Sequence, residues 1–586
     1  MMGGGLLASL SPPVAVAAAA SKASGCCRDF HGHPIWRNAH PGSTRFLHVA
    51  QGCGGRTTHR HLTKQRWFSC REQELGYLSS SGGEMLVASV GRKQRRCVEN
   101  VMVVRCLRKT EGEEVLPKRA VIVGAGPAGA LLALLLARQN WRVDVFESKH
   151  WDGDHWAAGE PAGWSVMLGG RAAHCLEKVG LKEEVWLKGV VCTGRTTIRE
   201  RGLTPKYQAY GYDMLAIPQA ELAAVLINSG LSNHPSQIFY HFGWSLQCLH
   251  PDEATTEFSH LCEDGDGGGS SSVEKMSVTA DLVVGADGLH SKTREELEWK
   301  TPSFSSSLQQ IPAGRHLRLR VPMDVVGTQI DEAGRVHGPS MLVVVRSSRL
   351  LWGLPNCDGT MALTLQGIKG STTSDVSKEM SESFPELAEI FSVDAEATRQ
   401  LAGAKERTQG TVVATTFNYK QTVLIGDAAH SLLNVTHLGT GLALEDCLVL
   451  GGLLQESLVA ISDSPETRDG QVAECVTAAL ARFSEERMPE MTAAANLCSE
   501  VAKTNMFQVE LQQAIMRVIA RVVPKIQPWQ KSANTKVISV KQLAGWRARE
   551  IVLVRVALVF ALLLMLIRAI RLVRLELHIS IKYLEL

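Results

Sequence analysis

The sequence lacks a strong net charge, a cysteine pair with metal-ligand spacing and any internal repeat. A net charge of +3 over 586 residues gives no case for nucleic-acid binding, which needs a concentrated basic surface. The fourteen cysteines include no CxxC pair, so we expect reduced thiols and no metal site. With 45% hydrophobic and 21% charged residues, the rest of the composition is that of an ordinary globular protein.

Acidic residues are scarce at the start of the chain. Residues 1–71 contain one acid, Asp29, against nine Lys or Arg residues, together with many Ser and Ala. An acid-poor leader that carries Arg and Ser resembles an organelle transit peptide. We therefore expect residues 1–115 to be a transit peptide and linker, with the chloroplast as the destination and the mitochondrion as the alternative.

Long apolar runs are also few, and the most prominent one lies near the C-terminus. Ile551 to Ile567 is apolar except for Arg555, and basic residues flank it on both sides. Its 17 residues are at the lower edge of what spans ~30 Å of hydrocarbon. We expect residues 546–575 to be a membrane-associated segment that either spans the bilayer or lies flat, with a buried helix as the alternative. The residues before it, 471–545, are expected to be helical.

One stretch, Arg119 to Glu147, has the complete pattern of a βαβ unit. An apolar strand leads into GAGPAG, a helix-forming run follows, and a second strand ends at an acid. In this pattern the glycines make a tight turn, let a pyrophosphate approach the backbone and bring helix and strand together, while the acid binds a ribose. The pattern predicts a dinucleotide site at Gly124, Gly126, Pro127, Ala128, Gly129 and Glu147.

Two further patterns place Gly and Asp at the ends of apolar strands. Asp287-Gly288 follows the strand near Leu282 and precedes a helix start, where Arg294 supplies positive charge. Gly426-Asp427 ends another apolar strand, so Asp427 is placed to bind a ribitol hydroxyl. Gly439-Thr440-Gly441 then opens a helix whose amides can stabilise negative charge on a flavin.

These three motifs, in this order, resemble the single-component (class A) FAD-dependent aromatic hydroxylases over roughly Arg119 to Arg487. The resemblance implies an α/β fold with a Rossmann-type FAD-binding domain, 116–470, a helical C-terminus and an inserted antiparallel-sheet substrate domain, about 190–280 and 310–410. It implies FAD, NADPH or NADH as co-substrate, and O₂, with a flavin C4a-hydroperoxide that hydroxylates an aromatic or apolar small molecule. The chain has a single GxGxxG motif. This agrees with the class, in which NAD(P)H has no Rossmann domain of its own.

Within the class, the chain is similar to the kynurenine 3-monooxygenase family. The similarity rests on Glu445-Asp-Cys-Leu-Val449 and on Arg482-Phe-Ser-Glu-Glu-Arg-Met-Pro489, and that family also has a C-terminal membrane anchor. The resemblance implies that Arg195 and Tyr210 hold a substrate carboxylate. It also implies that Gln219 contacts FAD where the family has an arginine.

The chain departs from that family beside the flavin ring. It reads His437-Leu-Gly-Thr-Gly441 where the family has Gly-Gln-Gly-Met-Asn, and Asn434 replaces a proline. FAD binding is compatible with these changes, but kynurenine as the substrate does not follow. His437, the candidate catalytic residue, either lines the substrate pocket or caps the helix. Two alternatives stay open: an FAD-dependent epoxidase or reductase of an isoprenoid lipid, and a catalytically altered flavoprotein scaffold.

Overall fold

The chain divides into Met1–Lys93 and Gln94–Leu586, and all residues that the structure describes belong to the second unit. Apart from β1 (Val101–Val103), the expected transit peptide and linker, 1–115, lies outside the described residues. The computed structural model describes residues 101–103, 118–153, 155–157, 164–199, 202–263, 271–319, 329–330, 336–346, 349–367, 378, 382–384, 400, 406–459, 465–503, 506–523, 526, 528–535 and 537–584.

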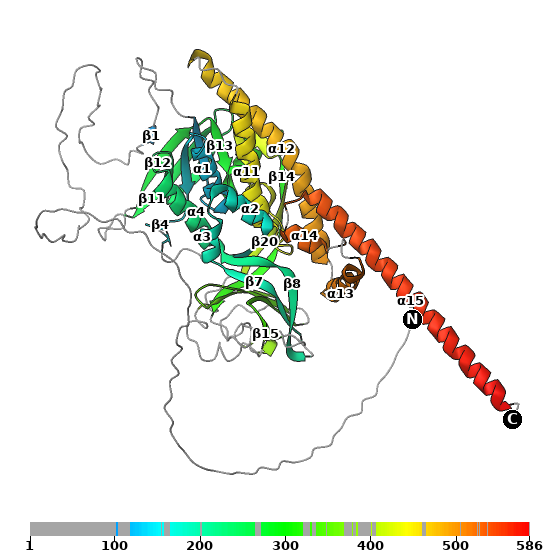
Figure 1. Cartoon of the computed structure of the whole chain (residues 1–586). Coiled ribbons are helices and arrows are strands. Elements are labelled where there is room, and N and C mark those ends of the chain that lie inside the picture. The colour runs from blue at the N-terminus through cyan, green and yellow to red at the C-terminus, as the bar shows by residue number, and fades with distance from the viewer. Residues whose placement is uncertain are drawn as a thin grey trace, which may run out of the picture. The chain divides into compact units, whose positions relative to one another are not determined.

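A six-stranded sheet lies at the centre of the second unit (Figure 1). Its strands, in spatial order, are β21 (Asn418–Tyr419), β22 (Thr422–Leu424), β13 (Leu282–Gly285), β2 (Arg119–Val123), β3 (Arg142–Glu147) and β9 (Ile238–Phe242). All neighbours are parallel except β21 and β22. Strands of such a sheet are covered on both faces and are therefore apolar along their length, as β2 and β13 are.

Different elements cover the two faces of this sheet, because successive side chains of a strand point to opposite sides. Ala120 and Ile122 join the main hydrophobic core, which includes residues of three helices, two of which pack against the third. Val121 and Val123 instead join a second core around Phe258. The three helices are α1 (Pro127–Ala137), α4 (Gln219–Asn233) and α11 (Gly439–Leu458).

The second core belongs to a four-stranded sheet. In spatial order it contains β1, β12 (Ser271–Thr279), β11 (Thr255–Glu263) and β10 (Trp244–His250). Phe258 of β11 stacks on Phe146 of β3, with ring centroids 3.7 Å apart. This small sheet therefore covers the face of the central sheet that the helices leave open.

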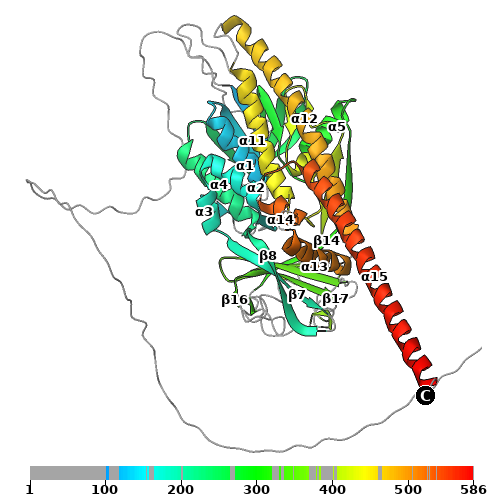
Figure 2. The same cartoon turned by 45° about the vertical axis from the view of Figure 1, so that its right-hand side comes forward.

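A third, eight-stranded sheet contains the long strands at the lower end of Figures 1 and 2. One of its seven neighbouring pairs, β17 with β7, is parallel, and the others are antiparallel. In spatial order its strands are β20 (Glu406–Ala414), β14 (Ser306–Leu319), β19 (Met361–Gln366), β18 (Arg349–Pro355), β17 (Ser340–Arg346), β7 (Val190–Arg199), β8 (Gly202–Pro218) and β6 (Ser165–Leu168).

The C-terminal part of the chain is helical. Helix α12 (Pro465–Lys503) packs against α11, and α15 (Val540–Leu584) packs against α12, α13 (Met506–Val522) and α14 (Trp529–Thr535). Figure 2 shows α15 leaving this contact and continuing away from the sheets. The remaining described elements are β4 (Trp151–Asp152), β5 (His155–Trp156), α2 (Gly170–Val179), α3 (Lys182–Leu187), α5 (Lys292–Lys300), β15 (Gln329–Ile330), β16 (Val336–His337) and α10 (Asp427–His430).

The predicted fold class is confirmed: an α/β dinucleotide-binding fold carries a largely antiparallel sheet and a helical C-terminus. The structure divides the residues of the predicted insert between two sheets. Strands β7 and β8, residues 190–199 and 202–218, lie in the eight-stranded sheet, whereas β10, β11 and β12 form most of the four-stranded one. The domain limits derived from the sequence stay predictions.

Candidate cofactor-binding and substrate-binding site

The glycine loop between β2 and α1 is shaped by two close approaches and one open position. Gly124 has φ +102°, and a Cβ atom there would lie 2.5 Å from the carbonyl oxygen of Ala286. A Cβ atom on Gly129 would lie 2.0 Å from the Gly124 oxygen, so only glycine lets α1 start this close to the loop. Gly126 differs, because a Cβ atom there would meet nothing within 4 Å. The space beside Gly126 is therefore open to a ligand at the N-terminus of α1, where free N–H groups favour phosphate.

Glu147 ends β3 beside this loop. Its carboxylate accepts hydrogen bonds from the backbone N–H groups of Ala125, at 2.8 Å, and Lys149, at 3.0 Å. The acid is thus held between the glycine loop and the residues that follow β3. This is the position in which the βαβ pattern predicts a ribose-binding carboxylate.

Asp287 lies between β13 and helix α5, whose N-cap residue is Ser291. Its carboxylate accepts hydrogen bonds from Ser291 Oγ at 2.6 Å and from the backbone N–H of Thr293 at 2.9 Å. Burial raises the pKa of Asp287, and these donors act against that rise. A Cβ atom on Gly288, which has φ +79°, would meet nothing within 4 Å. The turn therefore offers open backbone beside the glycine loop.

Gly426 and Asp427 stand at the start of α10, directly after β22 and Ile425. Gly426 has φ +58°, a backbone conformation that favours glycine. Its N–H donates to the carboxylate of Asp446 on α11, at 2.9 Å. Burial raises the pKa of Asp427. A cofactor hydroxyl that donates a hydrogen bond to this carboxylate would stabilise its ionised form.

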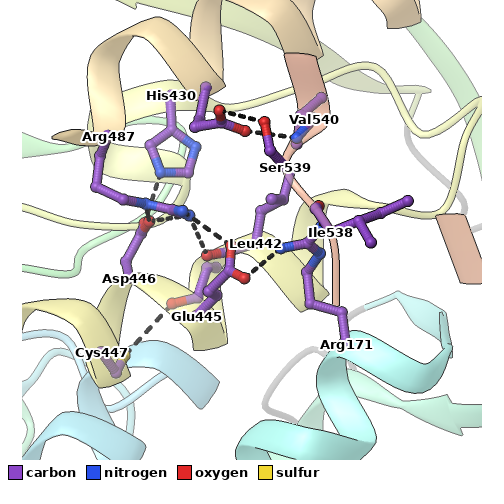
Figure 3. Close-up of polar contacts among 12 residues, drawn as sticks. Arg171, His430, Leu442, Glu445, Asp446, Cys447, Arg487, Ile538, Ser539 and Val540 are labelled. Carbon is purple, nitrogen blue, oxygen red and sulfur yellow. Dashed lines mark hydrogen bonds and ion pairs between the residues drawn. The ribbon is translucent and has the colours of Figure 1, made fainter. Parts of the chain in front are cut away.

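A network of buried charges fixes this turn (Figure 3). Asp446 Oδ2 lies 2.5 Å from His430 Nε2, and Asp446 Oδ1 accepts from Arg487 Nε at 2.9 Å. Burial alone raises the pKa of Asp446, but these partners outweigh burial and lower it. The network continues to Glu445, which lies 2.8 Å from Arg487 Nη1 and forms an ion pair with Arg171.

The same network reaches the start of α15. Arg171 donates to the carbonyl oxygen of Ile538 at 2.5 Å, and Glu490 accepts from Ser539 Oγ at 2.7 Å and from the Val540 N–H. Figure 3 shows these contacts joining α2, α11 and the residues before α15. Helix α11, whose N-terminus faces the cofactor loops, is therefore tied to the origin of the C-terminal helix.

The three motifs surround one cavity of about 460 Å³. Ten of the predicted cofactor-binding residues line it: Gly124, Gly126, Pro127, Ala128, Glu147, Gln219, Asp287, Gly288, Asp427 and Thr440. The open backbone beside Gly126 and Gly288, and the three carboxylates around them, fit a dinucleotide whose phosphates meet amides and whose hydroxyls meet acids. The residues present therefore fit FAD.

The other predicted residues lie outside the lining of this cavity. Gly129 and Gly426 shape the backbone behind it, and Gly439 and Gly441 flank Thr440 on α11. Arg294 is buried and donates to the carbonyl oxygens of Ala428, at 2.9 Å, and Leu289, at 2.7 Å. Its guanidinium therefore joins α5 to α10 instead of facing the cavity.

Several cavity residues are not among those that the sequence predicts. Lys149, His290 and Lys292 add positive charge within a few residues of the motifs. Trp244, Ser245 and Leu246 come from β10, whose sequence has no motif. Proximity to Glu147 and Asp287 was a signal for the first group. Trp244, Ser245 and Leu246 reach the cavity only because the four-stranded sheet packs on the central sheet.

The predicted substrate residues Arg195 and Tyr210 lie on neighbouring strands, β7 and β8. Arg195 Nη2 donates to Gln208 at 2.7 Å, while its Nε is buried without a hydrogen-bond partner among the described residues. The Tyr210 hydroxyl lies 3.7 Å from the sulfur of Met341. Burial raises the pKa of Tyr210, and the positive charge of Arg195 acts against that rise.

His437 lies near Arg195 although 242 positions separate the two in the sequence. It has φ +57° and directly precedes Leu438, the N-cap residue of α11. Burial, with a smaller contribution from the positive charge of Arg195, lowers the pKa of His437 to about 4. The imidazole forms no hydrogen bond with any described residue, so no capping contact supports the helix-cap alternative. The charge of Arg195 thus acts on both Tyr210 and His437, and all three residues lie outside the lining of the cofactor cavity.

One group of potential metal ligands lies elsewhere, on β10 and β11. The ligand atoms of Cys248, His250 and Glu257 are all within 4.8 Å of one another. The Lys300 ammonium lies 2.8 Å from the Cys248 sulfur, so a cation already occupies the neighbourhood of that thiol. The expectation that the protein needs no metal stays a prediction.

Comparisons with known proteins agree with this cofactor site. A family model described as an FAD binding domain matches residues 118–464. Kynurenine 3-monooxygenase of Salinispora tropica is 30% identical over 346 residues, which are 57% of this chain and 72% of that protein. The enzyme of the same name from Salinispora arenicola is 29% identical over 426 residues, 70% of this chain and 86% of that protein. The solved structure of 2-methyl-3-hydroxypyridine-5-carboxylic acid oxygenase aligns with 67% of this chain over 94% of its own chain. The sequence identity is 19% and the TM-score is 0.49.

The fold, the cavity and the family match define the class: the chain belongs to the FAD-dependent monooxygenases and is an FAD-binding oxidoreductase. Within that class it is similar to kynurenine 3-monooxygenases, as the motifs around Glu445 and Arg482 predict. The family match supports an enzyme rather than the alternative of a catalytically altered flavoprotein scaffold.

Proposed function

We propose that this protein uses NADPH or NADH and O₂ to hydroxylate an aromatic or apolar small molecule. The observation that carries the proposal is the single cavity onto which the GxGxxG, Asp287-Gly288 and Gly426-Asp427 motifs converge. FAD bound there supplies the redox chemistry, whereas the protein positions the cofactor and excludes water. No second nucleotide-binding βαβ pattern accompanies the first in the sequence, in keeping with a pyridine nucleotide that visits the flavin transiently.

The proposed substrate position lies beside Arg195, Tyr210 and His437. A guanidinium with an unpaired buried Nε suits an acceptor on the substrate. The low pKa of His437, about 4, keeps its imidazole neutral at physiological pH. It can therefore line the pocket without adding charge, and it can donate one hydrogen bond and accept another. We propose His437 as the residue that orients the reacting group.

Asp427→Ala tests the cofactor part of the proposal. We expect the variant to fold and to lose most of its FAD, because the carboxylate that faces the cavity is removed. Asp252→Ala is the control, since Asp252 is exposed and pairs with Lys420. FAD content is measured by visible absorption of the purified full-length proteins. A wild-type protein that is folded but takes up no FAD would overturn the proposed function.

A metabolite screen tests the monooxygenase part. The expected result is NAD(P)H oxidation that one class of substrate accelerates, with one oxygen atom from ¹⁸O₂ in the product. Arg195→Ala and Tyr210→Phe are then expected to weaken the binding of that substrate. Unchanged substrate affinity in both variants would remove these residues from the site.

A second candidate function is an epoxidase or reductase that acts on an isoprenoid lipid. The long apolar surface of α15 favours it, because Phe560, Leu562 and Met565 are more than 60% exposed. Only one described helix, over Val540–Arg574, is long and apolar enough to cross a membrane. Product analysis after incubation with lipid extracts distinguishes the two functions.

Membrane association through residues 546–575 and location in the chloroplast belong to the same proposal. The exposed apolar residues of α15 support the first, and the acid-poor leader supports the second. A fluorescent protein fused after residue 115 is expected to enter the chloroplast. Entry into mitochondria instead would favour the alternative, and a cytosolic signal would contradict both.

A further inference from the structure

A group of three potential metal ligands lies on one face of the four-stranded sheet. Cys248 of β10 pairs with Glu257 of β11, and paired residues of neighbouring strands share a face. His250 follows Cys248 by two positions on the same strand, so its side chain points to the same side. Leu249, between them, is fully buried and points to the opposite side. Strand register, not a sequence motif, therefore gathers a thiol, an imidazole and a carboxylate at one place.

The distances between these three side chains suit a tetrahedral Zn²⁺ ion. Zn–S bonds of ~2.3 Å and Zn–N and Zn–O bonds of ~2.0–2.2 Å place neighbouring ligand atoms roughly 3.3–3.6 Å apart. In the protein, Cys248 Sγ lies 3.5 Å from His250 Nε2, and that nitrogen lies 3.2 Å from Glu257 Oε1. All three ligand atoms lie within 4.8 Å of one another. One ion can therefore contact all three after small side-chain rotations.

The chemistry of the ligands selects zinc over the hard divalent cations. Mg²⁺ and Ca²⁺ prefer oxygen ligands, whereas a set of sulfur, nitrogen and oxygen atoms suits Zn²⁺. Cys248 is a free cysteine and only partly buried, and Glu257 is exposed, so an ion can enter from solvent. Three protein ligands leave a fourth position for a water molecule.

Lys300, the last residue of α5, is the group that the ion must displace from the sulfur. Its ammonium donates to Cys248 Sγ at 2.8 Å. It also donates to the carbonyl oxygen of Leu249 at 2.6 Å and lies 3.0 Å from a carboxylate oxygen of Glu296. Two acceptors for Lys300 therefore remain when the sulfur binds a metal ion. The thiolate and the Glu257 carboxylate together neutralise the two charges of Zn²⁺, so the loaded site carries no net charge that would repel Lys300.

We propose that Cys248, His250 and Glu257 form a Zn²⁺ site with one open position. On binding, the Cys248 S–H bond breaks, the proton leaves to solvent and a Zn–S bond forms, with no change of oxidation state. The three ligands lie outside the described lining of the cofactor cavity, so the flavin chemistry needs no ion at this place. The bound ion instead links β10 to β11 and stabilises the four-stranded sheet, whose Trp244 to Leu246 line that cavity.

Metal titrations of the full-length, FAD-loaded protein test the site. The protein is stripped with a chelator, kept reduced and titrated with Zn²⁺, and with Co²⁺ as a spectroscopic probe. Loss of a hydrogen bond to a metal ligand already weakens metal binding about 10- to 100-fold, so removing a ligand should weaken it at least as much. We therefore expect Cys248→Ser, His250→Ala and Glu257→Gln each to lose one equivalent of tightly bound Zn²⁺. Cys248→Ser should also lose the sulfur-to-cobalt charge-transfer absorption of this site.

Cys357→Ser and His155→Ala are the matched controls, because both residues are exposed and lie outside the ligand group. They should bind Zn²⁺ like the wild type. Zn²⁺ should raise the melting temperature of the wild type and of both controls but not that of Cys248→Ser, because an ion that binds only the folded state stabilises it.

Glu257→Gln keeps the test decisive if Cys248→Ser or His250→Ala does not fold. Glu257 is exposed, so its amide variant should fold like the wild type and retain FAD. Zn²⁺ binding by folded Glu257→Gln and Cys248→Ser with the stoichiometry and affinity of the wild type would overturn the proposal. Failure of the wild type to bind FAD would overturn the proposed function and leave the Zn²⁺ titration to be judged by itself.

Discussion

The carboxylate of Asp446 accepts the backbone N–H of Gly426 at 2.9 Å, so a residue inside helix α11 fixes the turn that presents Asp427. Asp446 is fully buried and also binds His430 and Arg487. A buried carboxylate with three partners is a strong constraint, because removing it leaves Arg487 as a buried cation that has lost one of its two acids. The cofactor turn is therefore supported by residues that do not line the cofactor cavity.

Asp446→Ala is expected to destabilise the fold by about 3–5 kcal/mol and to weaken FAD binding. Asp446→Asn keeps the size but replaces the charge, so we expect a smaller loss of stability and a persisting loss of FAD affinity. Denaturant unfolding and FAD fluorescence measure the two effects. FAD affinity equal to that of the wild type in both variants would show that the Gly426 turn holds without Asp446.

Two alanine substitutions in the glycine loop are expected to act in different ways. Gly126→Ala adds a methyl group where nothing lies within 4 Å, so the protein should fold normally and bind FAD weakly. Gly129→Ala places its methyl group 2.0 Å from the Gly124 oxygen, so the fold itself should be destabilised. Melting temperature separates the two outcomes. Equal melting temperatures for both variants would contradict the conclusion that Gly129 is needed for packing and Gly126 only for the ligand.

Asp144 is expected to make stability depend on pH at the acid end. Burial raises its pKa, but hydrogen bonds from His241 and Arg119 outweigh burial and lower it from 3.8 to about 2. Since the folded-state pKa lies below the unfolded value, the ionised carboxylate stabilises the protein above about pH 4, and this is lost as the pH falls toward 2. The contribution is about 2 kcal/mol.

The measurement for Asp144 is the melting temperature between pH 2 and 5. The wild type should lose stability steeply over this range, and Asp144→Asn should lose much less because the titrating group is gone. Asp152→Asn is the control, since Asp152 is 72% exposed. A wild-type slope that Asp144→Asn leaves unchanged would assign the acid sensitivity to other carboxylates.

The C-terminal helix provides a test of membrane association. Leu562 of α15 is 63% exposed within an apolar stretch, and an aspartate there costs about 2.5–3.5 kcal/mol if the residue lies in the bilayer. Leu562→Asp should therefore move the protein from liposomes to the soluble fraction in flotation. Leu187→Asp is the matched control, because Leu187 lies on α3 and is 82% exposed. This variant should still float with the liposomes. Flotation of both variants like the wild type would place the apolar surface of α15 in a protein contact.

Much of the central fold follows from local sequence patterns. The strand–glycine–helix–strand pattern from Arg119 to Glu147 predicts β2, α1 and β3, because the apolar run, the glycines and the acid each have one local role. Asp287 and Asp427 are found in the same way, as polar residues directly after apolar strands. These predictions succeed because their causes lie within a few residues of each other.

The role of Arg294 was not accessible in this way. Arg294 follows a motif and looks like a cofactor-facing cation, but its guanidinium binds the carbonyls of Ala428 and Leu289. Long-range packing decided this, since α10 lies more than 130 positions away.

The sequence by itself therefore determined the cofactor class, through short-range backbone requirements that only certain residues meet. It also determined the apolar character of the C-terminal helix. Tertiary structure alone decided which side chains share a cavity, which buried charges pair with Asp446, and how His437 comes to lie near Arg195. The physical reason is that strand register and helix packing depend on the summed contacts of many distant residues, which no local pattern contains.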